Sequence, residues 1–449
     1  TGVSVRWVVR TGRRGAEAYR SRAPICHAGW SKWIPSRRLE TGHPDSLAFA
    51  PLAETPPPPA SVATGPTVTP AIEAFLADSG AATPFVVVDV DVVAARYSSL
   101  QAALPTADIY YAVKANPGLP VLERLAAAGS SFDVASRGEV DLCLSLGITA
   151  DRISYGNTIK KSADIAHAHE VGVGIFAVDS HAELDKVVRH APGATVSVRL
   201  RHDSESADWP LSRKFGCDSD DVVDLVRSAA ASGSVTGISF HVGSQQRDVE
   251  AWDDAFVVIE RILDRLGADA DAVQFLNLGG GFPASYIGYT PPVGDYGGAI
   301  NEAMQRRFAG RDLSLMVEPG RYLVGDAGVL RSEVVLVSRR TPDVHTRWVY
   351  LDVGKFHGLA ETIDEAIRYR VRTSRDGGLS GPAVLAGPTC DSVDVLYEKN
   401  PYQLPLDLME GDTIDFLSTG AYTTTYSSVG FNGFAPLAEY FVDSSTIGR

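Results

Sequence analysis

The chain of 449 residues has few cysteines and lacks any long apolar run. Its four cysteines, Cys26, Cys143, Cys217 and Cys390, lie far apart and form no CxxC pair. This spacing argues against a zinc ribbon or a dithiol redox site, and a disulfide framework is not expected in a chain of this length. We therefore expect reduced thiols, a cytoplasmic location and no bound metal ion. No window of 18 unbroken apolar residues occurs, so the sequence predicts no membrane span.

An excess of basic charge is absent as well. The chain holds 41 Lys+Arg and 55 Asp+Glu, which gives a formal net charge of 41 − 55 = −14. Apolar residues make up 45% and charged residues 21%, which is close to the average for soluble globular proteins and excludes a disordered or collagen-like chain. The acidic balance argues against nucleic acid or an anionic membrane as the main partner.

The first 65 residues differ from the rest of the chain. Residues 1–60 hold 9 Lys+Arg and 4 Asp+Glu, a balance of +5 that leaves −14 − 5 = −19 for the remainder. The segment has no apolar periodicity and runs into Pro56-Pro57-Pro58-Pro59. An Arg-rich targeting peptide is one interpretation, although no apolar core with a small-residue cleavage site marks a secretory signal. We interpret residues 1–65 as a disordered extension with a stiff proline linker, outside the fold.

From about residue 85 onward, short apolar runs alternate with Ala- and Leu-rich stretches of helical spacing. Eight such runs fall within roughly 220 residues, which is typical of a (β/α)₈ TIM barrel and predicts one over residues 80–325. A doubly wound sheet is the alternative, but its Gly-rich loop would normally follow the first strand rather than the seventh. The eight runs are 110–116, 132–136, 153–157, 175–180, 196–200, 238–244, 275–281 and 315–320.

After residue 325 the helical pattern fades. Residues 334–337, 347–352, 384–386, 413–416 and 439–442 are expected strands between Gly/Pro turns. They predict a C-terminal β-domain, a sandwich or barrel, over residues 326–449. The apolar segment 85–91, which precedes the barrel, is expected to join this β-domain.

Polar residues stand at the ends of the predicted barrel strands, where TIM barrels build their active sites. Burying one polar group is costly without a partner, and several at the same end are hard to explain by packing. The residues concerned are Lys114, Asp133, Arg199, His241 and Glu318. Lys114 lies between apolar neighbours, so we expect a desolvated amine with a lowered pKa, suited to Schiff-base chemistry.

A glycine run completes this set of residues. Gly279, Gly280 and Gly281 follow the seventh strand, where their backbone N–H groups could approach a phosphate closely. Glu318 and Arg321 lie at the end of the eighth strand, next to the usual phosphate site of barrels. A lysine, a phosphate site and a carboxylate in one pocket together indicate pyridoxal phosphate, whose pyridine nitrogen the carboxylate would keep protonated.

The motifs YAVKAN, FDVASRGE, FHVGSQ, LGGGFP, EPGRY, GPTCDS and GAYTTTYSS occur in this order. With them the chain resembles the fold-type III pyridoxal phosphate decarboxylases, which act on ornithine, lysine or diaminopimelate, over about residues 80–440. The resemblance is nearest to the bacterial ornithine/lysine decarboxylases. It implies an alanine-racemase-like barrel joined to a β-domain, and a homodimer with shared active sites.

The resemblance also implies a role for each residue of the expected site. Lys114 would hold the cofactor as a Schiff base, His241 would stack on the ring, and Glu318 would pair with the pyridine nitrogen. Cys390, reaching the partner subunit's pocket, would protonate the substrate carbon after carbon dioxide leaves. The phosphate would be held by Ser244, Gly279, Gly280, Gly281, Gly320, Arg321 and Tyr422. The cofactor and its lysine would be supported by Asp133, Glu139 and Arg199.

Substrate choice depends on the acidic residue after the cysteine. Diaminopimelate decarboxylases typically have Glu there, whereas this chain has Asp391, which suits a bare ammonium and repels a distal carboxylate. Glu365 would be a second acidic contact of the substrate. The sequence thus indicates L-ornithine converted to putrescine, L-lysine converted to cadaverine, or both, in polyamine biosynthesis. Diaminopimelate decarboxylation and an inactive, antizyme-inhibitor-like binding protein are the alternatives.

Overall fold

A computed structural model describes residues 68–202, 207–209, 214–339 and 345–446. The expected N-terminal extension and linker, and with them Cys26, lie outside these residues. The chain divides into two units, residues 1–59 and 60–449, and the second contains all the elements described here. Among the described residues, no helix has both the length and the apolarity that crossing a membrane requires.

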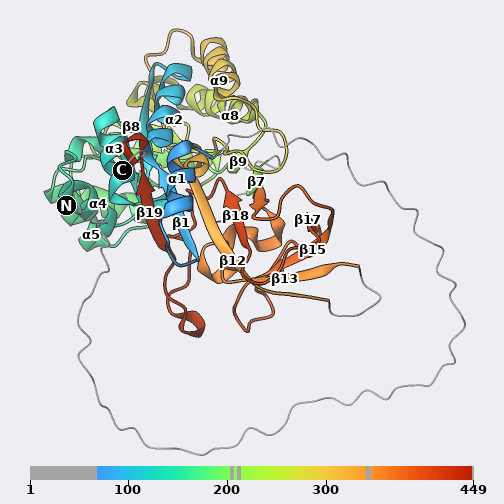
Figure 1. Ribbon diagram of the computed structural model, residues 1–449. Helices are drawn as coiled ribbons and strands as arrows, with labels where there is room; N and C mark the ends of the chain where they lie inside the picture. Colours follow the sequence, from blue (N-terminus) through green and yellow to red (C-terminus); the bar gives the residue numbers. More distant parts are fainter. Residues whose placement is uncertain (1–67, 203–206, 210–213, 340–344, 447–449) are drawn as a thin grey trace, which may run out of the picture. The chain divides into compact units, whose positions relative to one another are not determined.

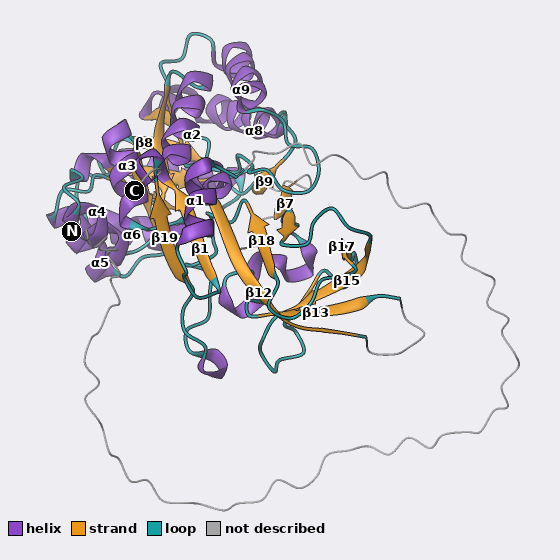
Figure 2. Cartoon of the chain, in the orientation of Figure 1, coloured by secondary structure: helices purple, strands orange, loops and turns teal. Residues whose placement is uncertain are grey.

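Eight parallel strands close into a barrel, which confirms the predicted fold and excludes the doubly wound sheet (Figures 1 and 2). Each strand is a short apolar run, as a strand covered on both faces requires. The barrel strands are β2 (Ala107–Ala112), β3 (Ser131–Val134), β4 (Ile153–Tyr155), β5 (Ile175–Val178), β6 (Thr195–Arg199), β8 (Thr236–Ser239), β10 (Val273–Asn277) and β11 (Ser314–Val317). They follow one another around the barrel, and β11 pairs with β2 to close it.

Helices connect successive strands. The long helix α8 shows why they form, because its buried residues recur every three or four positions and make one apolar face. These residues are Ala251, Trp252, Ala255, Phe256, Ile259, Ile262, Leu263 and Leu266. The helices are α2 (Val90–Ala103), α3 (Leu119–Ala128), α4 (Arg137–Ser145), α5 (Ser162–Glu170), α6 (His181–His190), α7 (Ser219–Ala231), α8 (Ala251–Leu266), α9 (Val293–Phe308) and the one-turn α10 (Arg321–Val324). Strands β7 (Ala207–Trp209) and β9 (Ser244–Gln246), which α7 and β8 separate in the chain, form a two-stranded antiparallel sheet outside the barrel.

A nine-stranded mixed sheet contains the remaining strands. The long strand β12 (Gly328–Ser338) is its centre, pairing with β18 (Thr413–Leu417), β13 (Arg347–Leu351) and β1 (Phe85–Asp89). The other members are β14 (Val371–Thr373), β15 (Ser380–Ala386), β16 (Val395–Leu396), β17 (Tyr402–Pro405) and β19 (Ala438–Val442). Strand β1 runs antiparallel to β12 and parallel to β19, and all five of its residues are buried.

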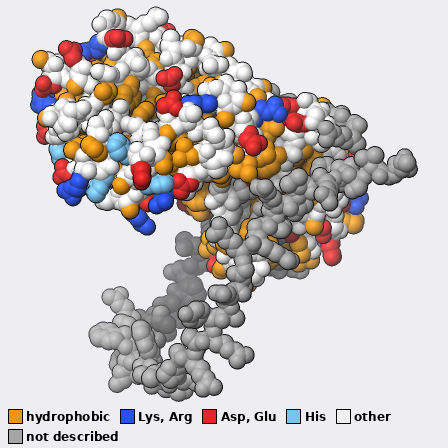
Figure 3. All heavy atoms as spheres, turned by 90° about the vertical axis from the view of Figure 1, so that its left-hand side faces the viewer, with side chains coloured by type: hydrophobic (Ala, Val, Ile, Leu, Met, Phe, Trp, Pro, Cys, Tyr) orange, Lys and Arg blue, Asp and Glu red, His pale blue; other side chains and the backbone are white. Residues whose placement is uncertain are grey.

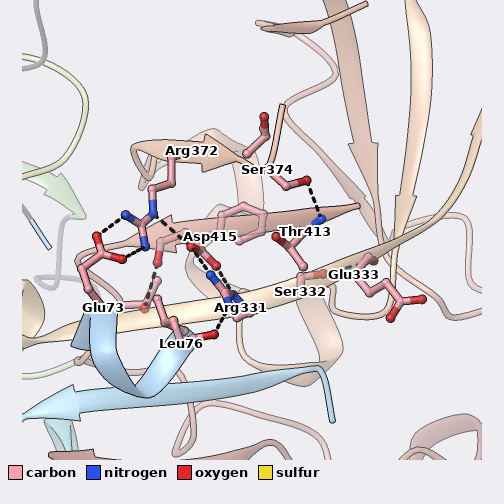
Figure 4. Close-up of polar contacts among 12 residues, drawn as sticks. Glu73, Leu76, Arg331, Ser332, Glu333, Arg372, Ser374, Thr413 and Asp415 are labelled. Atoms are coloured by element: carbon pink, nitrogen blue, oxygen red, sulfur yellow. Dashed lines mark hydrogen bonds and ion pairs between the residues drawn. The ribbon is translucent and has the colours of Figure 1, made fainter. Parts of the chain in front are cut away.

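Helix α1 (Pro70–Asp78) is fixed to this sheet by packing and by ion pairs (Figure 4). The Phe75 ring packs edge-on against Phe85, with centroids 5.7 Å apart. Asp415 of β18 is buried between two arginines, at 2.8 Å from Arg331 Nε and 3.0 Å from Arg372 Nε. Arg372 also binds Glu73 of α1, and Arg331 donates to the carbonyl of Leu76 at 2.9 Å. A single buried carboxylate therefore links the N-terminal helix to two strands of the sheet.

The surface of the barrel carries charges of both signs. On the face shown in Figure 3, acidic and basic side chains lie interspersed, with apolar side chains between them. The ion pairs on the helices are of this kind, for example Arg265 with Asp220 at 2.8 Å. Such exposed pairs contribute little stability individually.

Candidate active site

The polar residues expected in the site follow the carboxyl ends of the barrel strands. Lys114 lies in the 3₁₀ turn η1 (Val113–Ala115) directly after β2, and Asp133 lies in β3. Arg199 ends β6, and His241 and Glu318 come one or two residues after β8 and β11. Because all strands of the barrel are parallel, these residues share one end of it. A cavity at this end is lined by Ser154, Gly156, Ala177, Ser197, Arg199, Ser239, Phe240, His241, Asn277 and Glu318.

The Lys114 amine lies 3.8 Å from the Asp133 carboxylate, and its side chain is 53% exposed. Burial lowers the pKa of this amine, but Asp133, Tyr422 and Glu318 together outweigh that effect and raise it above its ordinary value. The expectation of a desolvated lysine with a lowered pKa is therefore wrong for the protein without a ligand. The apolar neighbours in sequence do not reveal the carboxylates that β3 and β11 bring to it.

Asp133 lies so close to Gly156 that a side chain at position 156 would collide with its carboxylate. A Cβ at Gly156 would lie 2.1 Å from Asp133 Oδ1, so only glycine fits beside it. Burial and the nearby Glu318 raise the pKa of Asp133, an effect that the attraction of Lys114 opposes. Glu139 accepts the backbone N–H of Ala135 at 2.7 Å and supports the turn after β3. Burial raises the pKa of Glu139 as well.

His241 is neutral in this environment. Burial, then Arg199 and Lys114, lower its pKa well below the usual value of 6.5. Its Nδ1 accepts the backbone N–H of Gly243 at 2.9 Å, so the ring proton belongs on Nε2. A Cβ at Gly280 would lie 3.2 Å from that Nε2. The ring thus presents an N–H donor towards the glycine loop.

The glycine loop and the segment after β11 support each other. Glu318 donates its backbone N–H to the carbonyl of Gly279 at 2.8 Å. Gly279 and Gly281 have φ values of 65° and 105°, in the region that favours glycine. A Cβ at Gly280 would lie 2.7 Å from the Glu318 carbonyl oxygen, and one at Gly320 would lie 3.1 Å from the Tyr422 hydroxyl. These close approaches leave backbone, rather than side chains, at the surface that could receive a phosphate.

Arg321 and Tyr422 also lie beside the glycine loop and the segment after β11. The guanidinium of Arg321 is buried and lies 5.0 Å from the centre of the Tyr422 ring. Its Nε and Nη2 donate to Ser244 Oγ at 3.2 and 3.1 Å. Tyr422 itself has φ of 57°, which is uncommon for a tyrosine, and donates its backbone N–H to Ala115 at 2.9 Å. This bond ties the tyrosine to the turn that carries Lys114.

Three residues that the sequence patterns did not single out support residues of the expected site or, in the case of Asp394, the loop that carries Cys390. Glu361 pairs with Arg321 through both of its oxygens, and both side chains are at most 5% exposed. Asn277 donates to Glu318 at 2.6 Å. Asp394 is buried and accepts from Thr389 Oγ1 at 2.7 Å and from the backbone N–H of Lys355 at 2.8 Å. No local signal marks these partners, and none of the three lies within the seven motifs listed above.

Cys390 and its neighbours form a separate group. Cys390 is exposed, and its Sγ lies 3.5 Å from Asn432 Oδ1. Asp391 accepts the backbone N–H of Val393 at 2.9 Å. Glu365 binds the backbone N–H of Lys399 at 2.6 Å and the Asn400 amide at 2.8 Å. Among the described residues, no hydrogen bond or ion pair connects Cys390, Asp391 or Glu365 to the group around Lys114.

The residues at the barrel end fit pyridoxal phosphate. Asp133 Oδ1 and Ser197 Oγ are buried without a hydrogen-bond partner among the described residues, as expected where a polar ligand completes the site. An amine, a neutral imidazole, a carboxylate and a glycine-lined backbone cradle are the donor set that this cofactor requires.

Comparison with known proteins agrees with this geometry. Residues 90–325 match the family model described as the pyridoxal-dependent decarboxylase, pyridoxal binding domain. The lysine/ornithine decarboxylase of Selenomonas ruminantium is 33% identical over 354 residues, 78% of this chain and 88% of that protein. The structure of lysine/ornithine decarboxylase from Vibrio vulnificus complexed with cadaverine superposes with a TM-score of 0.73 at 32% identity, covering 82% of this chain and 97% of that one. The arginine decarboxylase of Paramecium bursaria Chlorella virus, bound to agmatine, gives a TM-score of 0.74 at 29% identity, covering 82% and 100%.

Proposed function

Because the chain belongs to the fold-type III family of pyridoxal phosphate-dependent decarboxylases, we propose that it decarboxylates a basic diamino acid, preferring L-ornithine and accepting L-lysine. The protein is a carboxy-lyase of the polyamine-forming type that uses pyridoxal phosphate. The observation that carries the proposal is the convergence of Lys114, neutral His241 and Glu318 at one end of the barrel. When bound, the cofactor supplies an electron sink for the charge left by the departing carbon dioxide.

Each residue has a task that follows from its surroundings. Lys114 would hold the cofactor through its aldehyde carbon, and Asp133 would keep the amine oriented from 3.8 Å. His241 would lie against the ring, with its Nε2 proton available to a polar group of the ligand. Glu318 would hold a proton at the pyridine nitrogen. Asp133, Glu139 and Arg199 would support this arrangement from the neighbouring strands.

The phosphate would rest on the backbone of Gly279, Gly280, Gly281 and Gly320, with the hydroxyls of Ser244 and Tyr422. Arg321 would contribute less charge than its position suggests, because Glu361 already neutralises it. Because it donates to Ser244 Oγ, it would orient that hydroxyl at the phosphate.

We assign Asp391, next to Cys390, as the residue that binds the distal ammonium of the substrate. An aspartate at this position attracts an ammonium and repels the second carboxylate of diaminopimelate. Glu365 would be a second acidic contact, although its carboxylate already accepts the backbone N–H of Lys399 and the side-chain amide of Asn400. Ornithine and lysine differ by one methylene, for which pockets discriminate by about 1–3 kcal/mol, so both are expected substrates.

The Cys390 group is proposed to act on the partner subunit's site in a homodimer. Beside it, a hollow of about 360 Å³ is lined by Phe356, Ala360, Ile363, Val393 and Tyr426 and by more polar neighbours. Val393 and Val429 are 59% and 84% exposed, and Ile363 and Tyr426 about half exposed. Apolar groups exposed together in this way are typical of a protein interface. A second copy seated here would bury them and bring its own Lys114 site towards Cys390.

The location proposed for the enzyme is the cytoplasm. Cys143, Cys217 and Cys390 are free thiols, the form that a reducing compartment maintains. Cell fractionation with an antibody against the protein tests this directly, and enrichment in a secreted fraction would contradict it.

The test of function is a steady-state comparison of ornithine, lysine, arginine and meso-diaminopimelate by carbon dioxide release. We expect kcat/KM to be highest for ornithine, within about 200-fold for lysine, and lowest for diaminopimelate. A preference for arginine or diaminopimelate would overturn the substrate assignment. Lys114→Ala should abolish both turnover and the borohydride-reducible absorbance of bound cofactor. A purified protein that takes up no pyridoxal phosphate would instead support the inactive binding homologue.

The shared site has its own test. Lys114→Ala and Cys390→Ala proteins, each inactive alone, should regain part of the activity when mixed under exchange conditions, because one of the two sites in a hybrid dimer is intact. Light scattering should show a dimer. A monomer, or a mixture that regains no activity, contradicts the proposed assembly.

A further inference from the structure

Asn277 lies between the two strand ends that supply the ring-binding residues. It is the last residue of β10, is buried, and lines the same cavity as His241 and Glu318. Its backbone carbonyl accepts the N–H of Phe240, which precedes His241, at 3.1 Å. Its side chain donates from Nδ2 to Glu318 Oε1 at 2.6 Å and accepts at Oδ1 from the Gly279 N–H at 2.9 Å. The residue thus contacts the glycine loop, the carboxylate and the strand of the histidine at once.

The orientation of this amide is fixed by its partners. The backbone N–H of Gly279 can only donate, so the side-chain oxygen must face it and the NH₂ group must face Glu318. Glu318 Oε1 therefore receives a donor. Its second oxygen, Oε2, has no hydrogen bond to any described residue.

We infer that Asn277 is a positioning residue, which holds the Glu318 carboxylate in place with one oxygen occupied and leaves the other for the pyridine nitrogen of the cofactor. This inference rests on the proposed function. Through Gly279, the same amide also fixes the start of the phosphate cradle relative to the carboxylate. One side chain thereby sets the distance between the two ends of the cofactor's site.

The sharpest substitution is Asn277→Asp, which preserves shape and the acceptor for Gly279 but replaces the donor with a second carboxylate. Two carboxylates at hydrogen-bond distance cannot both be ionised and would share a proton. Glu318 would then hold the proton at the pyridine nitrogen less firmly. The matched control is Asn301→Asp on α9, whose amide donates to the carbonyl of Ala103 at 3.1 Å and does not line the cavity.

The experiment measures the pH dependence of the bound cofactor's absorbance, together with kcat and KM. For Asn277→Asp we expect the spectral midpoint to move by about one pH unit or more, and kcat to fall about 100-fold with little change in KM for ornithine. Asn301→Asp should leave the midpoint and kcat as in the wild type. A midpoint within 0.3 units of wild type, with kcat within about twofold, would overturn the inference.

A double-mutant cycle tests whether Asn277 acts through Glu318. In a Glu318→Gln background, Asn277→Asp should cost at most about threefold more in kcat, because the carboxylate that it disturbs is already gone. Full additivity of the two losses would show that Asn277 acts independently, and would refute the inference.

Two further results separate the possible failures. If Asn277→Asp does not fold, Asn277→Ala removes the donor without adding charge, and we expect about a tenfold fall in kcat with a smaller spectral shift. Unchanged kcat and spectrum in Asn277→Ala would then overturn the inference. If the wild-type protein takes up no pyridoxal phosphate, the proposed function itself fails. If the wild type is active and Asn277 variants behave like it, only the role of Asn277 fails.

Discussion

Replacing Glu361 by alanine should test how the phosphate end of the site is stabilised. Glu361 binds Arg321 through both oxygens, at 2.7 Å from Nη1 on one side, and both side chains are at most 5% exposed. Burial alone would lower the pKa of Arg321, but Glu361 and Tyr286 outweigh it and keep the guanidinium charged. Removing the carboxylate leaves a buried cation with only the hydroxyls of Tyr286 and Ser244.

The magnitude follows from the burial of the pair. Breaking a buried ion pair by removing one partner costs about 3–5 kcal/mol. A folded unit of some 380 residues unfolds with an entropy of about 0.8 kcal/mol per kelvin, so Tm should fall by about 5 °C. The control is Glu302→Ala, which removes an 80% exposed side chain lying 3.6 Å from Arg306. Its expected effect is below about 0.5 kcal/mol and below about 1 °C.

The assay is calorimetric or fluorimetric unfolding of both variants, without cofactor and with saturating pyridoxal phosphate. Since the cofactor phosphate supplies a negative charge near Arg321, the loss in Glu361→Ala should shrink when it is bound. A Tm equal to that of Glu302→Ala would refute the reasoning about the buried pair. An equal loss with and without cofactor would refute its connection to the phosphate.

Two other substitutions test the ionisation of Glu439 and the close packing at Gly280. Burial raises the pKa of Glu439 from 4.5 to about 7, so its ionisation lowers the stability of the folded state as pH rises from 4.5 to 7. Glu439→Gln should therefore raise Tm by about 3 °C at pH 8 and change it little at pH 4.5, whereas an equal shift at both pH values contradicts this. Gly280→Ala places a Cβ 2.7 Å from the Glu318 carbonyl and should weaken pyridoxal phosphate binding at least about tenfold in a titration. Gly298→Ala in α9, with no atom within 4 Å of the new Cβ, is its control, and similar affinities for both would contradict the expected clash.

The sequence predicted the barrel because its strands are short apolar runs that alternate with helical spacing. The observed strands end earlier than the predicted ones, as β2 does at Ala112 rather than at residue 116. Lys114, His241 and Glu318 lie in the turns just after their strands, although the apolar pattern continues up to them. The apolar pattern therefore does not mark the residue at which a strand ends. Strands β14, β16 and β17 were not predicted, because such short strands form through their neighbours rather than through their own pattern.

The sequence predicted the site residues that lie at strand ends. It did not predict the residues that support the site by binding another of its side chains. Lys114, His241 and Glu318 are marked by position, since each interrupts an apolar run. Asn277 and Glu361 are separated from their partners by 41 and 40 residues, and nothing local announces a hydrogen bond across that distance. The pKa of Lys114 was mispredicted for the same reason. Its electrostatic environment comes from other strands, whereas only its neighbours in the chain are visible in the sequence.

The position of β1 has a consequence for how the protein is made. Ribosomal synthesis produces β1 before its sheet partners, yet Phe85 pairs with Arg331 and with Ala438, which is 438 − 85 = 353 residues further along. At about 5–20 residues per second, the second partner follows after about 20 to 70 seconds. Before β12 is made, 331 − 85 = 246 residues or about 12 to 50 seconds after Phe85, the apolar segment Phe85-Val86-Val87-Val88 has neither edge covered, and until β19 is made it still has one edge without its native partner. The nascent chain therefore carries an aggregation-prone segment with an uncovered edge until synthesis is nearly complete, and a shortened form that stops before β19 would leave that edge open.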